Sequence, residues 1–144
     1  MLARKPKSED WVEPMPAKQF RKIEKAFKLH GGKFVMGKEA DAILDMQEAE
    51  ASTFNEYTIL FRSKPSRAAV FEELIHTAQY REGRCDGSQD SRLQNEIEAK
   101  EKLIKYSTTY GLTEIEVENT KMMLSACKEE LKRLRKEQLW LFMT

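Results

Sequence analysis

The chain has 144 residues, of which 40% are hydrophobic and 34% charged, and its 25 basic and 24 acidic residues leave a formal net charge of +1. This composition is typical of a globular domain with one core and is too apolar for general disorder. A net charge so close to zero gives no electrostatic reason to expect a nucleic acid or a membrane surface as partner. No apolar run approaches the roughly 18 residues of a membrane span.

The two ends of the sequence differ from its middle. Residues 1–15 are polar and contain prolines, which predicts a flexible tail or linker. They lack the apolar segment of a secretory signal, so we expect a cytoplasmic protein or one delivered by a carrier. Residues 16–137 should form the folded domain. Residues 138–144 are expected to be an apolar C-terminal tail that folds back on the domain or contacts a partner.

The first half of the domain alternates between helix and strand signals. The run YTILFR at 57–62 is the strongest strand signal because it is β-branched and aromatic. His30 precedes two glycines that can end a helix, and a histidine beside a helix C-terminus is favoured by the dipole, so we prefer this explanation to a ligand role. Helices are expected over 17–29 and 38–46, and strands over 33–36, 51–54 and 57–62.

The second half predicts three longer helices. One runs over 67–80 with Ser66 as its N-cap, the next over 91–110 with Gly111 at its end, and the last opens with a capping box at 113–116. Cys127 lies on the apolar stripe of the last helix and is expected to be a small buried hydrophobic residue. Cys85 and Cys127 are too few for a disulfide framework and form no CxxC pair. Helices around a small sheet predict the α+β class.

The middle of the 67–80 helix carries the most informative polar residues. Glu72, His76 and Gln79 follow one another at i, i+4 and i+7, and Glu73 lies one turn before His76 on the same side. Two carboxylates and an imidazole held on a rigid helix are how metal hydrolases present their ligands and base. The alternative is a solvated polar face. The opposite face is apolar, through Val70, Phe71, Leu74, Ile75 and Ala78.

Glu96 follows His76 by twenty residues, across a loop that contains glycine. Two helices joined in this way can pack antiparallel, which would place Glu96 opposite Glu72 and His76. A hydrolytic zinc site needs three protein ligands and one open position, so these three residues would be the ligands and Glu73 the general base toward water. The strand at 57–62, if it lies at the edge of the sheet, could pair with an extended peptide substrate.

These residues resemble a known family. Glu72-Glu73-Leu74-Ile75-His76 resembles the HExxH helix of zincin metallopeptidases, with glutamate in place of the first histidine, and Glu96-Ile97-Glu98-Ala99 resembles the glutamate helix of the gluzincin branch. Roughly residues 17–135 resemble the zincin-like modules of bacterial polymorphic toxins and phage head-morphogenesis proteins. The resemblance implies a minimal zincin-like fold, in which a small antiparallel or mixed sheet packs against a metal-site helix and two further long helices.

The resemblance also implies an activity and partners. The activity would be that of a zinc-dependent peptidase, its substrate a protein or peptide, and its other partners a larger phage or toxin chain or an immunity protein. One imidazole and two carboxylates also suit iron or manganese. Glu98 is an alternative third ligand, since it lies about 200° from Glu96 around a helix, and the resemblance favours Glu96. Gln79 could orient a ligand or lie on the surface.

Other functions remain as alternatives. The missing first histidine favours a zincin-like scaffold without catalysis, a structural or interaction module whose polar cluster is a hydrogen-bond network. A di-iron bundle needs ExxH motifs on two helices, but the chain has only two histidines and His30 follows no such motif. Serine or cysteine nucleophile chemistry has no support, because the sequence contains no GxSxG and neither Cys85 nor Cys127 has a histidine close by in the sequence.

Overall fold

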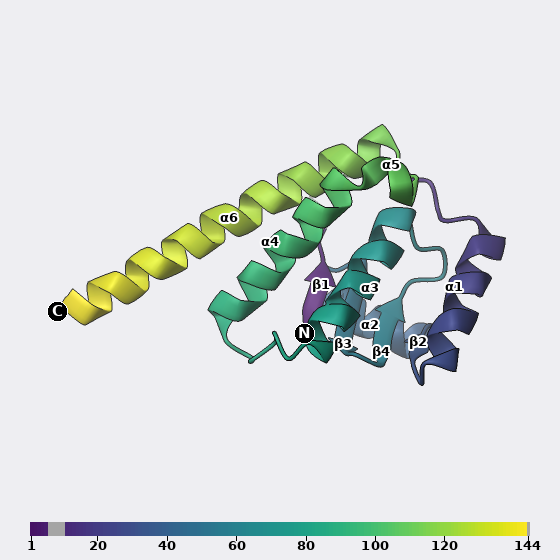
Figure 1. Ribbon diagram of the computed structural model, residues 1–144, viewed down its shortest axis with the longest axis horizontal. Coiled ribbons are helices and arrows are strands. Elements are labelled where there is room, and N and C mark those ends of the chain that lie inside the picture. The colour runs from purple at the N-terminus through teal and green to yellow at the C-terminus, as the bar shows by residue number, and fades with distance from the viewer. Residues whose placement is uncertain (6–10, 144) are drawn as a thin grey trace.

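Four strands form one mixed sheet in the computed structural model, which describes residues 1–5 and 11–143 (Figure 1). Their order across the sheet is β1-β3-β4-β2, in which β3 pairs antiparallel with β1 and β4, and β2 pairs parallel with β4. The strands are β1 (Leu2–Arg4), β2 (Lys33–Val35), β3 (Ala51–Asn55) and β4 (Thr58–Phe61), and the helices are α1 (Ala17–Leu29), α2 (Lys38–Met46), α3 (Arg67–Arg81), α4 (Gln89–Lys105), α5 (Ser107–Tyr110) and α6 (Glu114–Met143). The expected α+β class is confirmed.

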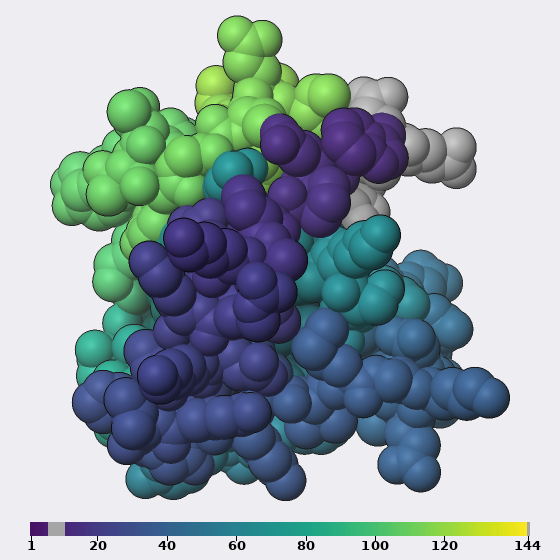
Figure 2. Space-filling view, turned by 90° about the vertical axis from the view of Figure 1, so that its right-hand side faces the viewer, coloured from purple at the N-terminus to yellow at the C-terminus, as the bar shows by residue number. Residues whose placement is uncertain are grey.

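Helices cover both faces of this sheet. Side chains alternate along a strand, so Ile59 and Phe61 of β4 point to one face and Leu60 to the other. Ile59 and Phe61 belong to a core cluster shared with α1 and α3, whereas Leu60 packs with Leu44 of α2. Figure 2 shows α1, in purple to dark blue, covering the middle of one side of the molecule, below the green residues of the α5–α6 region.

Most local signals in the sequence are borne out. The helices over 17–29 and 38–46 have the expected bounds, and α3 extends one residue beyond its expected end. Ser66 caps α3 by accepting a hydrogen bond from the backbone N–H of Ala69 at 3.1 Å. Thr113 and Glu116 form the reciprocal bonds of a capping box at the start of α6.

Two helix predictions need correction. The helix expected over 91–110 starts at Gln89, with Ser88 as its N-cap, and is interrupted at Tyr106 before the short α5. Tyr106 separates the two helices because its backbone angles, φ −106° and ψ 25°, lie outside the α-helical region. The tail expected over 138–144 does not fold back, because α6 continues to Met143 and extends past the N-terminal start of α4 (Figure 1), whereas Thr144 lies outside the described residues. None of the helices described is both long and apolar enough to span a membrane.

One prediction that concerns the sheet is wrong, and the condition attached to another is not met. The segment 1–15, expected to be a tail or linker, contains the buried strand β1, while residues 6–10 lie outside the described part. The strand expected over 57–62 is not at an edge, because β4 lies between β3 and β2. Pairing partners, which no local pattern specifies, decide both questions.

Candidate functional site

The polar face of α3 is the buried one. Glu72, Glu73 and His76 have exposed fractions of 0%, and Gln79 is 2% exposed. Phe71 on the opposite face is only half-buried. Because charged groups are rarely buried unless they are paired, this face must meet partners from other elements. The alternative of a solvated polar face is wrong.

Helix α4 brings the first of these partners. The Nε2 atom of His76 lies 2.6 Å from Oε1 of Glu96, so the predicted juxtaposition of these two residues is confirmed. Glu98 instead points away, is about one-third exposed and pairs with the Arg84 guanidinium. Of the two alternative third ligands, only Glu96 therefore reaches His76.

Gln79 fixes the orientation of the His76 ring. Its side-chain nitrogen donates to the backbone carbonyl of Asn95 at 3.0 Å, which leaves its oxygen facing Nδ1 of His76 at 2.7 Å. Nδ1 must therefore carry a proton, and in neutral His76 the lone pair is on Nε2. Gln79 is buried, so the surface alternative for this residue is wrong.

Glu73 is held by the sheet. The hydroxyl of Thr53, in β3, donates to Oε1 of Glu73 at 2.9 Å and also lies 3.2 Å from the Glu73 carbonyl. This bond fixes one oxygen of the carboxyl group and leaves the other without a described partner. The candidate base is thereby anchored to an element other than its own helix.

Two buried cations complete the cluster, and sequence reasoning missed both. Arg4 of β1 donates to Glu72 at 3.0 Å, and the Lys100 ammonium lies 3.6 Å from Glu72 and 3.5 Å from Glu96. Lys100 could have been found, because it lies at i+4 from Glu96 on the same face of α4. Arg4 left no such signal, since its partner Glu72 is 68 positions away.

Each of the three proposed ligands and the proposed base also has one buried atom that lacks a hydrogen bond. The unpartnered atoms are Glu72 Oε2, Glu73 Oε2, His76 Nε2 and Glu96 Oε1, for which the described residues supply no hydrogen bond of acceptable geometry. His76 Nε2 and Glu96 Oε1 lie 2.6 Å apart, so they form an ion pair when His76 is protonated, although the angles of this contact fall outside those of a hydrogen bond. Unpartnered buried polar atoms call for an ion or a water, and one imidazole with two carboxylates is a donor set that suits a divalent metal.

The side chains of the proposed ligands do not converge on one point. Within the described chain, no three His, Cys, Asp or Glu side chains are arranged so that they could hold a metal ion. The positions of Arg4 and Lys100 account for this, because both lie on the Oε1 side of Glu72 and attract its carboxylate. The donor chemistry thus fits a metal, whereas Glu72 is engaged by two cations.

Burial and charge shift the pKa values in this cluster in opposite directions. Burial raises the pKa of Glu73 to about 8. Burial alone would lower the pKa of His76, but Glu96, Glu73 and Glu72 together outweigh this effect and the pKa rises to about 9. Burial alone would raise the pKa of Glu96, but the charges of Lys100 and His76 lower it to about 2. At neutral pH without a metal, Glu73 and His76 therefore hold protons and Glu96 does not.

No family model, curated protein or solved structure matches the chain. The zincin-like resemblance, the zinc cofactor and the association with phage or toxin chains therefore stay predictions.

Proposed function

We propose that the chain is a metal-dependent hydrolase domain that acts on a protein or peptide. Glu72, His76 and Glu96 would hold the metal, and Glu73 would be the general base. One observation carries this proposal: of the six buried side-chain atoms that lack a hydrogen bond in the described chain, four belong to these four residues, one to each. The second oxygen or nitrogen of each of these side chains lies against a named protein partner.

The proposed roles follow from these contacts. A bound zinc, iron or manganese ion would polarise a substrate carbonyl and lower the pKa of water. Gln79 keeps the Nε2 lone pair of His76 available by accepting the proton of Nδ1. Thr53 orients the Glu73 carboxyl group, which holds a proton at neutral pH without a metal and would become the base when a bound metal had displaced that proton.

A second candidate is supported by the two buried cations. Arg4 and Lys100 neutralise part of the charge of Glu72 and Glu96 without any metal. In that case the cluster is an ion-pair network that fixes β1, α3 and α4 against one another, and the domain is a structural or interaction module that keeps the scaffold without the catalysis.

Metal uptake distinguishes the two candidates. The full chain is stripped with chelator, titrated with Zn²⁺, Mn²⁺ or Fe²⁺ and analysed by elemental mass spectrometry. We expect about one metal per chain in the wild type, loss of that metal in His76→Ala, and retention in His30→Ala. His30 is the matched control because it is exposed at the C-terminal end of α1. A wild type that takes up no metal would rule out the hydrolase and leave the ion-pair network.

The general base has its own test in the same preparation. Glu73→Gln should keep the metal and lower the hydrolysis of an unfolded protein substrate by about 10²- to 10⁴-fold. Glu118→Gln is the matched control, since Glu118 is mostly exposed on α6. Unchanged hydrolysis in Glu73→Gln removes Glu73 from the mechanism while leaving the metal ligands in place.

A further inference from the structure

Strand β1 pairs with β3 on the side opposite β4, and both β1 and β3 carry residues that bind the candidate site. The register pairs Leu2 with Thr53, Ala3 with Ser52 and Arg4 with Ala51. Thr53 is the residue whose hydroxyl holds Glu73. Without β1, β3 would be the edge strand beside the candidate base, with its backbone groups free to pair with another extended chain.

The Arg4 side chain fills a site shaped for a guanidinium. It is 2% exposed, and each of its three nitrogens meets a different acceptor. Nε donates to Glu50 at 3.2 Å, Nη1 to Glu72 at 3.0 Å and Nη2 to the Thr120 hydroxyl at 2.9 Å. A lysine ammonium cannot reproduce this planar set of three donors, so the site is selective for arginine.

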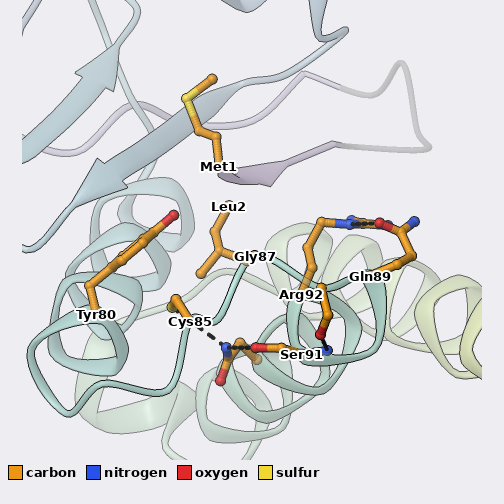
Figure 3. A pocket seen from close by; sticks show the side chains of 10 residues that line it. Met1, Leu2, Tyr80, Cys85, Gly87, Gln89, Ser91 and Arg92 are labelled. Atoms are coloured by element: carbon orange, nitrogen blue, oxygen red, sulfur yellow. Dashed lines mark hydrogen bonds between the residues drawn. The ribbon is translucent and has the colours of Figure 1, made fainter.

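Two hollows lie beside β1. One, of about 150 Å³, is lined by Met1 and Leu2 together with Tyr80, Cys85 and Arg92 (Figure 3). The other, of about 280 Å³, is lined by Ala3 and Lys5 together with Arg92 and Glu96. Arg92 and residues of β1 border both hollows, and the second hollow reaches Glu96 of the candidate site.

We infer that β1 occupies a peptide-binding groove along the edge of β3, and that the ligand of this groove is an extended peptide with an arginine in the position of Arg4. Main-chain pairing with β3 supplies affinity, and Glu50, Glu72 and Thr120 select the arginine. That this peptide is also a substrate rests on the proposed function. As long as β1 is in place, it competes with the peptide at the high effective concentration of a tethered segment.

Peptide binding to the full chain tests the inference. A fluorescein-labelled peptide with the sequence of residues 1–5 is titrated in the presence of EDTA, and its anisotropy is followed. Arg4→Ala should bind it about tenfold tighter than the wild type, because the tethered competitor has lost its arginine. A peptide with norleucine in place of arginine should bind Arg4→Ala about tenfold more weakly than the arginine peptide. The inference is overturned if Arg4→Ala and the wild type bind the arginine peptide equally and Arg4→Ala binds both peptides equally. It is also overturned if no saturable binding is seen.

A matched variant tests whether tighter peptide binding depends on Arg4 itself or follows from the loss of any arginine. Arg62→Ala removes a guanidinium that binds the Ala49 carbonyl and Asp45 and none of the three acceptors of Arg4, and it should bind the peptide as the wild type does. Since EDTA is present, hydrolysis plays no part in the measurement. Peptide binding by Arg4→Ala in a chain that takes up no metal supports the groove and removes the hydrolase. Metal uptake without peptide binding overturns the groove and leaves the hydrolase in place.

Hydrogen exchange in the wild type covers the case in which Arg4→Ala does not fold. The groove requires β1 to leave the sheet without global unfolding. The backbone amides of β1 should therefore exchange at least about tenfold faster than those of β4. If the amides of β1 exchange only as slowly as the slowest amides of β4, the strand is a fixed part of the sheet and the inference is wrong.

Discussion

The two ring nitrogens of His76 have opposite surroundings. Nδ1 is fixed by Gln79, whereas Nε2 has no hydrogen-bond partner in the described chain and faces Glu96 at 2.6 Å. Glu72 shows the same division, because Oε1 is held by Arg4 and Oε2 is unpartnered. A residue that ligates a metal is normally oriented through the atom that does not ligate, so both residues are prepared in the way that the proposed role requires.

The chelator-treated protein should lose stability as the pH rises from 6 to 9. The raised pKa values of Glu73, about 8, and His76, about 9, mean that the folded state holds two protons that the unfolded state releases from about pH 4.5 and 6.5 upward. The stability they contribute is lost as the pH passes through 8 and 9. Each group contributes a slope of at most about 1.4 kcal/mol per pH unit. Urea unfolding at a series of pH values measures this slope.

Glu73→Gln isolates one of the two groups. An amide resembles the protonated carboxyl group and cannot ionise, so the variant should show about half the wild-type slope between pH 6 and 8. The lowered pKa of Glu96, about 2, acts in the other direction and only in acid, where stability falls as the pH drops from about 4.5 toward 2. An unchanged slope in Glu73→Gln would mean that the Glu73 carboxyl is already ionised at pH 6.

At the scale of the elements, one carboxylate connects the starts of α3 and α6. Glu116 is fully buried and accepts a hydrogen bond at 2.7 Å from the backbone N–H of Ala68, in the first turn of α3. Its other oxygen accepts from the backbone N–H and the hydroxyl of Thr113, at 3.1 and 3.2 Å. A negative charge is thus placed at two helix N-termini at once, where the dipoles favour it.

Replacing Glu116 by alanine should lower the free energy of unfolding by about 2–4 kcal/mol, because it removes two caps and leaves buried N–H groups unpaired. Glu118→Ala is the matched control, two positions along the same helix and mostly exposed, and it should leave the stability nearly unchanged. Urea unfolding of both variants checks the prediction. Similar losses in the two variants would show that Glu116 acts through helix propensity rather than through its contacts with α3.

The elements that could be predicted are those whose signals are local. The N-cap of Ser66, the capping box at Thr113 and the bounds of α1 all depend on residues within one turn of one another. Glu96 could be placed near His76 because a single loop joins their helices. The role of Arg4 could not be predicted, since its three partners lie 46, 68 and 116 positions away and the composition of its segment resembles that of a linker. Long-range pairing alone makes that segment a strand.

At the scale of the whole molecule, the buried cluster is where β1, α3, α4 and α6 meet. Two cations, Arg4 and Lys100, face three carboxylates, Glu50, Glu72 and Glu96. This leaves one negative charge to be balanced, which the His76 proton does without a metal. A divalent metal would supply two positive charges, which balance if His76 and Glu73 both give up their protons. The cluster can thus be neutral in either state.

Removing one resident cation should therefore separate the two candidate functions. Lys100→Met keeps the volume of a buried side chain but leaves Glu72 and Glu96 short of one positive charge, which should cost about 3–5 kcal/mol of stability in chelator. If the cluster binds metal, added Zn²⁺ should restore most of this loss and should bind more tightly than in the wild type, because the metal replaces the missing charge. Thermal and urea unfolding with and without Zn²⁺ measure both effects.

Lys102→Met is the matched control for this prediction. It lies on the same helix, is about half exposed and pairs only loosely with Glu98, at 3.8 Å, so it should show neither the loss nor the recovery. A Lys100→Met protein that is destabilised and does not respond to Zn²⁺, Mn²⁺ or Fe²⁺ would mean that Lys100 is an irreplaceable part of a closed ion-pair network. The unpartnered atoms of Glu72, His76 and Glu96 would then be satisfied by water, and the module would act through binding rather than hydrolysis.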